Sequence, residues 1–121
     1  MNNLSQSVTS LQSLIQEGKT IEAMERFYAE NVTMQENNDA PRVGKAVCIA
    51  HESASLARVK AMQGTLKNYA INEETGRVFQ EWTYQFTNHK DQTFTLNEVS
   101  LQTWENDQIV SERFFYKEFL T

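Results

Sequence analysis

The sequence contains little cysteine, proline or glycine, with one cysteine, one proline and four glycines in 121 residues. Because Cys48 is alone, no disulfide can form within the chain, and a reducing compartment such as the cytoplasm suits it. So few prolines and glycines leave little material for flexible linkers, and the length is typical of one domain. We therefore expect a single domain over residues 1–121.

Long apolar runs are also missing. The longest one, AVCIA at residues 46–50, is far shorter than the roughly 20 residues of a membrane-spanning helix. Residues 1–10 have neither the basic start nor the apolar run of a signal peptide. These observations predict a soluble, cytoplasmic protein without a membrane partner.

The chain has no cluster of Lys or Arg, and its formal net charge is -5. A surface that binds nucleic acid needs such a cluster, so we expect no nucleic-acid partner. His51 and His89 are far apart and, together with Cys48, make no metal-ligand spacing. The Gly44-Lys45 pair is not accompanied by the other residues of a phosphate-binding loop. No metal and no cofactor are expected.

Three apolar patterns at helical spacing occupy the first half of the chain. The first runs from Leu4 to Gly18, which is placed to end a helix. The second starts at Thr20, a suitable N-cap, and should end near Glu30. The third and longest spans residues 43–62. Its apolar stripe would consist of Val47, Ala50, Ala54, Ala57 and Ala61.

The second half of the chain is rich in β-branched and aromatic residues. Alternation of period two already predicts a short strand at residues 31–36, followed by a loop at 37–42. Four further strands are expected at residues 65–74, 77–89, 92–104 and 108–119. Helices followed by an antiparallel meander indicate an α+β fold, with three helices packed on one face of a curved sheet.

The last two strands carry apolar side chains on both faces. In the last one, Val110, Glu112, Phe114 and Tyr116 alternate with Ile109, Ser111, Arg113 and Phe115. Helices can cover only one face, so we expect a second copy of the chain to cover the other. The sequence thus predicts a homodimer through the outer sheet face.

Glu98 is a candidate functional residue because it shares a strand face with Phe94, Ser100 and Trp104. If the helices cover that face, burial should raise the pKa of Glu98 unless a cation lies nearby. Such a carboxyl group is either hydrogen-bonded in the core or directed into a cavity.

Three parts of the sequence are familiar: FYAENVTMQE at 27–36, Gly44 before the third helix, and WENDQIVSERFFY at 104–116. Through these segments the chain resembles the SnoaL-like branch of the nuclear-transport-factor-two-like superfamily. The resemblance extends over nearly the whole length of the chain. The resemblance implies a cone-shaped α+β barrel, in which three helices and a bent sheet enclose one pocket, and commonly a dimer. Members include isomerases, cyclases, hydrolases and dehydratases as well as non-catalytic proteins, so the fold leaves the function open.

The resemblance also implies site residues. Glu36, eight positions after Tyr28, matches the general base of ketosteroid isomerase-like enzymes. The first helix lacks their tyrosine, and Ser100 stands at the position of their aspartate, so ketosteroid isomerase activity is not expected. Glu98 and Glu112 are the candidates to replace that pair. The pocket residues are then Glu36 and Glu98 as catalytic groups, with His51, Trp82, Tyr84, Ser100, Trp104 and Glu112 binding the ligand.

Two functions remain open. In the first, the pocket binds a small, largely apolar molecule, and Glu36 and Glu98 transfer a proton in a cofactor-independent isomerisation, cyclisation or hydration. In the second, the pocket is vestigial and the protein is a non-catalytic dimerisation or protein-interaction module. A pocket filled by Trp82 and Trp104, or Glu98 paired with Arg113, would favour the second.

Overall fold

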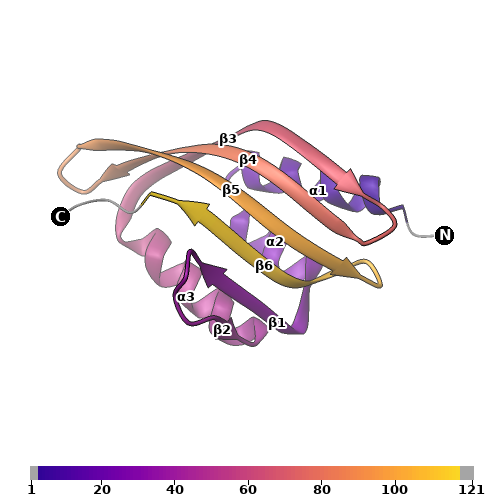
Figure 1. Ribbon diagram of the computed structural model, residues 1–121. Helices are drawn as coiled ribbons and strands as arrows, with labels where there is room; N and C mark the ends of the chain where they lie inside the picture. The colour runs from indigo at the N-terminus through magenta and orange to yellow at the C-terminus, as the bar shows by residue number, and fades with distance from the viewer. Residues whose placement is uncertain (1–2, 118–121) are drawn as a thin grey trace.

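The computed structural model describes residues 3–117. Its elements are α1 (Leu4–Gln16), α2 (Thr20–Phe27), β1 (Tyr28–Glu36), β2 (Arg42–Val43), α3 (Lys45–Ala57), β3 (Val59–Asn72), β4 (Arg77–Asn88), β5 (Thr93–Glu105) and β6 (Gln108–Tyr116). The three helices lie on one side of a single bent sheet (Figure 1). This is the predicted α+β class, with three helices on a curved and mainly antiparallel sheet.

The strands are ordered β2-β1-β6-β5-β4-β3. All neighbours pair antiparallel except β1 and β6, which are parallel. The main core lies where α1 and α2 cover β1 and the adjoining ends of β4, β5 and β6. Its fully buried members include Val8, Leu11, Val32, Val78 and Ile109. The other end of the sheet remains free to enclose a cavity.

Gly18 ends α1, as predicted. Its φ angle of 82° is left-handed, a conformation that glycine adopts without a steric penalty. Its N–H donates to the carbonyl of Ile15 at 3.0 Å, and the N–H of Lys19 donates to Leu14 at 2.8 Å. These two bonds form a Schellman motif, which satisfies carbonyls at the helix end.

The second helix is shorter than the sequence pattern indicates. It ends at Phe27, and the chain is already extended at Tyr28, three residues before the predicted strand. The N-cap is Lys19 rather than Thr20, and the Thr20 hydroxyl is buried without a hydrogen-bond partner. Tyr28 and Val32 are buried in the strand. Burial of these side chains against the core therefore outweighs the helical periodicity of the segment.

The third helix was predicted wrongly in length and in orientation. It has 13 residues and ends at Ala57, and Val59–Asn72 forms a strand that pairs with β4. Cys48 is its buried residue, whereas Val47 is 53% exposed. The expected stripe that contains Val47 is therefore not the face that meets the core. The residues after Ala57 pair with β4, and this long-range pairing determines where the helix ends. Local sequence patterns cannot predict such a pairing.

The last strand contains an irregularity that alternation could not reveal. Ile109 pairs with Trp104 and is fully buried, although strict alternation places it on the outer face. The register shifts between Thr103 and Trp104, and a shift of one residue moves a side chain to the other face. The strand ends at Tyr116, and residues 118–119 of the predicted strand lie outside the described residues.

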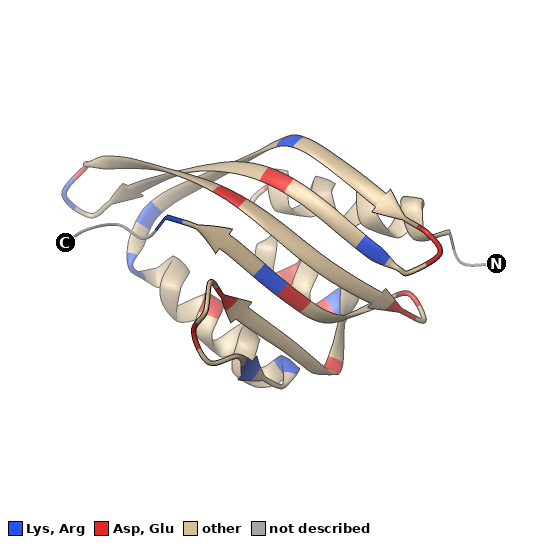
Figure 2. Ribbon diagram, in the orientation of Figure 1, with Lys and Arg blue, Asp and Glu red and all other residues tan. Residues whose placement is uncertain are grey.

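Charged residues are distributed over both layers. Figure 2 shows Lys and Arg interspersed with Asp and Glu on helices and strands. Within residues 3–117, no helix combines the length and the apolarity that crossing a membrane requires.

Candidate functional site

A cavity of about 860 Å³ lies between the helices and the concave face of the sheet. This volume is within the usual range of small-molecule sites. The walls include Ile15, Met24, Met34, Leu56, Met62, Trp82, Tyr84, Phe86, Leu96 and Phe114, with polar groups from every layer among them. The site therefore combines apolar walls with many polar side chains that could orient a ligand.

Aromatic rings of β4 form one continuous wall. Trp82 and Tyr84 stack with centroids 5.6 Å apart, and Tyr84 stacks on Phe86 at 6.1 Å. Gly64 lies opposite Tyr84 on β3. A Cβ atom at Gly64 would lie 2.8 Å from Cε1 of Tyr84, so the missing side chain makes room for that ring. The wall suits a flat, apolar ligand.

The strand register arranges the concave face in three rows. The first contains Met34, Glu112, Gln102 and Val78; the second contains Glu36, Phe114, Ser100 and Gln80; the third contains Tyr116, Glu98, Trp82 and Leu66. Each row thus presents one carboxyl group, and Glu52 of α3 also lines the cavity. Glu112 and Glu98 are separated by four residue steps, roughly 13 Å along an extended strand, so their side chains start from different rows of the sheet.

Glu112 is buried, with 5% of its surface exposed, and both carboxyl oxygens accept hydrogen bonds. The Tyr28 hydroxyl donates to Oε1, and Nε2 of Gln102 donates to Oε2 at 2.8 Å. Burial raises the pKa of Glu112 to about 7; the hydrogen bonds from Tyr28 and Gln102 act in the opposite direction, and the charge of Glu52 adds to the rise. Glu112 therefore loses its proton near neutral pH.

Glu98 is in a different environment, because no described residue gives it a hydrogen bond or an ion pair. Part of its side chain faces the cavity, so it is only half-buried, yet protein surrounds it on the remaining sides. Burial and, to a smaller extent, charge repulsion from Glu112, Glu52 and Glu36 together raise its pKa to about 8. Glu98 is therefore mostly protonated at neutral pH.

Burial and the charge of Glu36 also raise the pKa of Glu52, against the lowering effect of Arg42. Burial is likewise the main reason why the pKa values of Tyr28 and Tyr84 lie well above the ordinary value. Both phenols therefore remain protonated and can donate hydrogen bonds.

Glu36 is occupied by partners on both oxygens. Nη1 of Arg42 lies 2.9 Å from Oε2, and the Tyr116 hydroxyl donates to Oε1 at 3.0 Å. Each oxygen keeps a further lone pair, but the Arg42 guanidinium already compensates the charge of the carboxylate. The general-base role that the family resemblance implies for Glu36 therefore competes with a guanidinium and a phenol.

Most of the sequence-predicted site residues lie together. Glu36, His51, Trp82, Tyr84, Glu98, Ser100 and Glu112 all line the cavity. Trp104 instead packs in the core against Phe27, with ring centroids 5.7 Å apart. It connects to the cavity through Gln102, whose Oε1 accepts from the Trp104 indole at 2.9 Å.

Sequence reasoning missed several polar residues at the site, notably Glu52, Gln102 and Arg42. Glu52 follows Cys48 by one helical turn, so the buried cysteine was a usable signal for its face. Gln102 alternates with Trp104 on the same strand face, but its role depends on its partners. Arg42 lies in a segment predicted as a loop, and no pattern connects it to Glu36.

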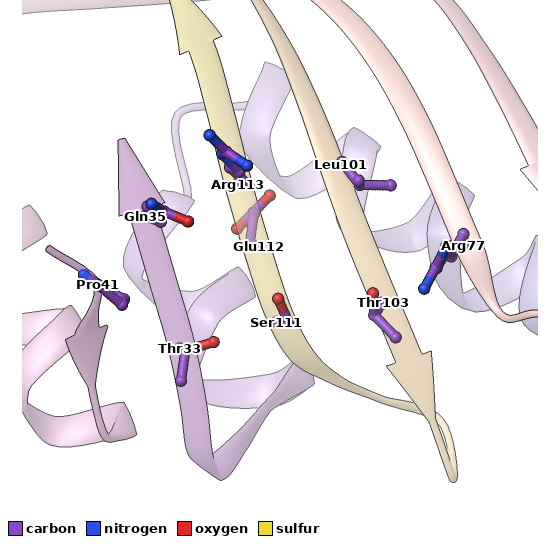
Figure 3. Close-up of a pocket in the computed structure, with 9 residues that line it drawn as sticks. All are labelled: Thr33, Gln35, Pro41, Arg77, Leu101, Thr103, Ser111, Glu112 and Arg113. Atoms are coloured by element: carbon purple, nitrogen blue, oxygen red, sulfur yellow. The ribbon is translucent and has the colours of Figure 1, made fainter. Parts of the chain in front are cut away.

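A second, smaller hollow of about 300 Å³ lies on the other face of the sheet. Figure 3 shows Gln35 and Thr33 of β1 beside Arg113 and Ser111 of β6, on the side away from the helices. Arg113 donates to the carbonyl of Asn37 at 3.1 Å and to Oδ1 of Asn38 at 2.8 Å. It is therefore engaged outside the cavity and does not pair with Glu98.

The model of the SnoaL-like domain family matches residues 11–112. Three solved structures share the fold. A Mesorhizobium loti protein, described as a candidate SnoaL-like polyketide cyclase, is 19% identical with a TM-score of 0.81, and the match covers 95% of this chain and 100% of that one. A nuclear-transport-factor-two-like protein of unknown function from Burkholderia pseudomallei is 15% identical with a TM-score of 0.81, over 97% and 92% of the two chains.

TerC, co-crystallised with polyporic acid, is 12% identical with a TM-score of 0.79, over 94% of this chain and 91% of its own. None of the curated proteins compared matches this chain. Identities this low establish a shared fold, whereas the family model extends over most of the sequence. By that match, the chain belongs to the SnoaL-like domain family.

Proposed function

We propose that the cavity binds a small, largely apolar molecule and transfers protons on it without a cofactor, in an isomerisation, cyclisation or hydration. One observation carries this proposal: an aromatic-walled cavity of about 860 Å³ holds two separate carboxyl groups, Glu112 and Glu98, with pKa values of about 7 and about 8. Groups that titrate near neutral pH are suited to accept and to donate protons there.

The two carboxyl groups act at different points of the ligand. A proton on a ligand carbon or hydroxyl passes to ionised Glu112, and protonated Glu98 donates its proton to a ligand oxygen. The separation of Glu112 and Glu98 by two rows fits this division, because a ligand must bridge them. We place the base at Glu112 rather than Glu36, because the Arg42 guanidinium already compensates the charge of Glu36, whereas both hydrogen-bond partners of Glu112 are neutral. Exchange with water then restores both groups.

The structural neighbours favour cyclase-type chemistry within this range. One is described as a candidate polyketide cyclase, and TerC was co-crystallised with polyporic acid. The mostly apolar walls and the stacked rings of Trp82 and Tyr84 fit cyclic ligands with few polar groups. We therefore propose aromatic and polyketide-like carbonyl compounds as the first class to screen.

The test begins with binding. Candidate carbonyl compounds are titrated while tryptophan fluorescence is recorded, because Trp82 lines the cavity. A compound that binds is then assayed for turnover by wild-type protein and by Glu98→Gln. We expect the variant to bind and to lose about 100-fold or more in turnover, the usual contribution of a positioned acid or base.

The matched control is Glu105→Gln, because Glu105 lies on the same strand but is exposed. It should retain wild-type turnover. Full turnover by Glu98→Gln on an identified substrate would show that Glu98 does not take part in the reaction.

The alternative, a non-catalytic module with a vestigial pocket, has less support. Its expected signs were a filled pocket or a Glu98–Arg113 pair. Trp104 lies in the core instead of filling the cavity, and Arg113 bonds Asn37 and Asn38 on the other side of the sheet. The positions of Trp104 and Arg113 therefore support the proposal that the pocket can admit a ligand.

We also propose a homodimer through the outer sheet face and a cytoplasmic location. Phe79, Val99 and Phe115 are 46%, 43% and 40% exposed on this face. Val99 pairs with Phe115, and Phe79 pairs with Leu101, so these side chains are contiguous across β4, β5 and β6. Cys48 is a buried free thiol, which suits a reducing compartment.

A further inference from the structure

A chain of buried hydrogen bonds leads from the core to Glu112. The indole Nε1 of Trp104 donates to Oε1 of Gln102 at 2.9 Å, and Nε2 of Gln102 donates to Oε2 of Glu112 at 2.8 Å. The Tyr28 hydroxyl donates to the other oxygen of the same carboxyl group. Gln102, Trp104 and Glu112 are at most 5% exposed. Water therefore cannot readily replace these partners.

The indole of Trp104 determines which way the Gln102 amide points. An indole N–H can only donate a hydrogen bond, so the group that faces it must be the amide oxygen. The NH₂ group of Gln102 is then necessarily directed at Glu112. A donor held in this position stabilises the ionised carboxylate more than the protonated carboxyl group, whose oxygens accept a weaker hydrogen bond.

We propose that Gln102, oriented by Trp104, is a positioning residue that holds Glu112 in its ionised form and thereby makes it the proton acceptor of the cavity. The acceptor role rests on the proposed function, whereas the charge state of Glu112 is a property of the free protein. Nothing in the resemblance to ketosteroid isomerase-like enzymes assigns a role to Gln102 or Trp104.

Two comparisons within the cavity support this inference. Glu98 receives no hydrogen bond from a described residue that would oppose the effect of burial on its pKa, whereas Tyr28 and Gln102 oppose that effect at Glu112. Gln80 is a buried glutamine of the neighbouring strand, but it bonds Gln12 at 3.1 Å and Ser100 at 3.4 Å, both of them neutral. Only the glutamine that contacts a carboxyl group can affect its ionisation in this way.

Other titratable groups also act on Glu112. Those interacting with it from the surrounding elements are Tyr28, Cys48, Glu52, Tyr84 and Glu98. None of these side chains changes in the variants used below, so their effects are common to all samples.

The test is a pH titration of the ligand-free protein, in which ¹³C NMR follows the side-chain carboxyl carbons of glutamate. The Gln102→Met variant keeps an unbranched side chain and removes the donor. Losing a hydrogen bond to a charged group should move the Glu112 midpoint upward by about one pH unit or more. Gln80→Met is the matched control, and we expect the Glu112 midpoint to stay at the wild-type value.

A second variant, Trp104→Phe, tests the orientation itself and provides an answer should Gln102→Met fail to fold. It retains Gln102 but frees its amide to rotate, so the Glu112 midpoint should again rise, by a smaller amount. An unchanged midpoint in a folded Gln102→Met or Trp104→Phe protein would overturn the proposal. The readout needs no substrate, so a failure to find turnover tests the proposed function separately.

Discussion

At the scale of single residues, three glutamates of one cavity differ because their immediate partners differ. Glu36 meets a guanidinium and a phenol, Glu112 accepts two neutral donors, and Glu98 has no such partner among the described residues. Burial raises the pKa of both Glu112 and Glu98. Hydrogen bonding and ion pairing distinguish the three, and neither can be inferred from the spacing of glutamates in the sequence.

The raised pKa values predict how stability depends on pH. Folding carries Glu98 from an ordinary pKa of 4.5 to about 8, so the folded state holds a proton that the unfolded state has released in this interval. The favourable contribution is complete below pH 4.5 and is lost as the pH rises through 8. We expect the free energy of unfolding, measured with urea, to fall from pH 5 to pH 8.5.

The Glu98→Gln variant tests the origin of this dependence. Because glutamine does not titrate, the variant should lose part of the slope and should be more stable than wild type at pH 8.5. Glu105→Gln, on the exposed part of β5, should keep the wild-type slope. A Glu98→Gln protein with the full slope would assign the effect to other groups.

At the scale of secondary-structure elements, the sequence predicted the periodic features and missed those set by long-range contacts. The first helix and its end at Gly18 follow from local spacing and local backbone conformation. The end of α3 at Ala57 does not, because the next residues form β3 by pairing with β4. Alternation placed Glu98 and Ser100 on the cavity face, but it failed at Ile109, where the register shifts.

Gly64 provides a test of how two strands shape the cavity. The Gly64→Ala substitution places a methyl group against the ring of Tyr84, which is already confined between Trp82 and Phe86. We expect a loss of about 1–3 kcal/mol in the free energy of unfolding, typical of overpacking, together with weaker ligand binding. Urea denaturation measures the first effect and a fluorescence titration the second.

The neighbouring Thr65 is exposed on the same strand and supplies the control. Thr65→Ala should leave both the stability and the binding near wild type. If Gly64→Ala behaved in the same way, Tyr84 would have to be free to move, and the stacked wall would not be rigid.

At the scale of the whole molecule, the exposed apolar residues of the outer sheet face predict self-association. Sedimentation at micromolar concentration should give twice the chain mass of 14.0 kDa. Val99→Lys should yield monomers, because forming the interface would bury the charge of the lysine. Within the same chain, Glu81 of β4 is the carboxylate that pairs with position 99 of β5. A wild-type protein that sediments only as a monomer would contradict the proposed dimer.

Val47→Lys serves as the control for the added charge. Val47 is 53% exposed on α3, in the layer of helices rather than on the outer face. The variant should sediment as wild type does. Equal dissociation by both variants would point to a general effect of charge and not to this interface.

The parallel pairing of β1 with β6 affects the order in which the site can be made. Tyr28 and Glu112 are 84 residues apart in the chain, and Glu36 and Tyr116 are 80 apart. Contacts at such separations form late because closing a long loop is entropically unfavourable. During translation, a nascent chain from which β6 has not yet emerged contains Glu36 and Glu98, together with Tyr28 and Gln102, but lacks the carboxyl group of Glu112. Glu112, Phe114 and Tyr116 of β6 complete the lining of the cavity, so we expect a nascent chain without β6 to lack a competent ligand site.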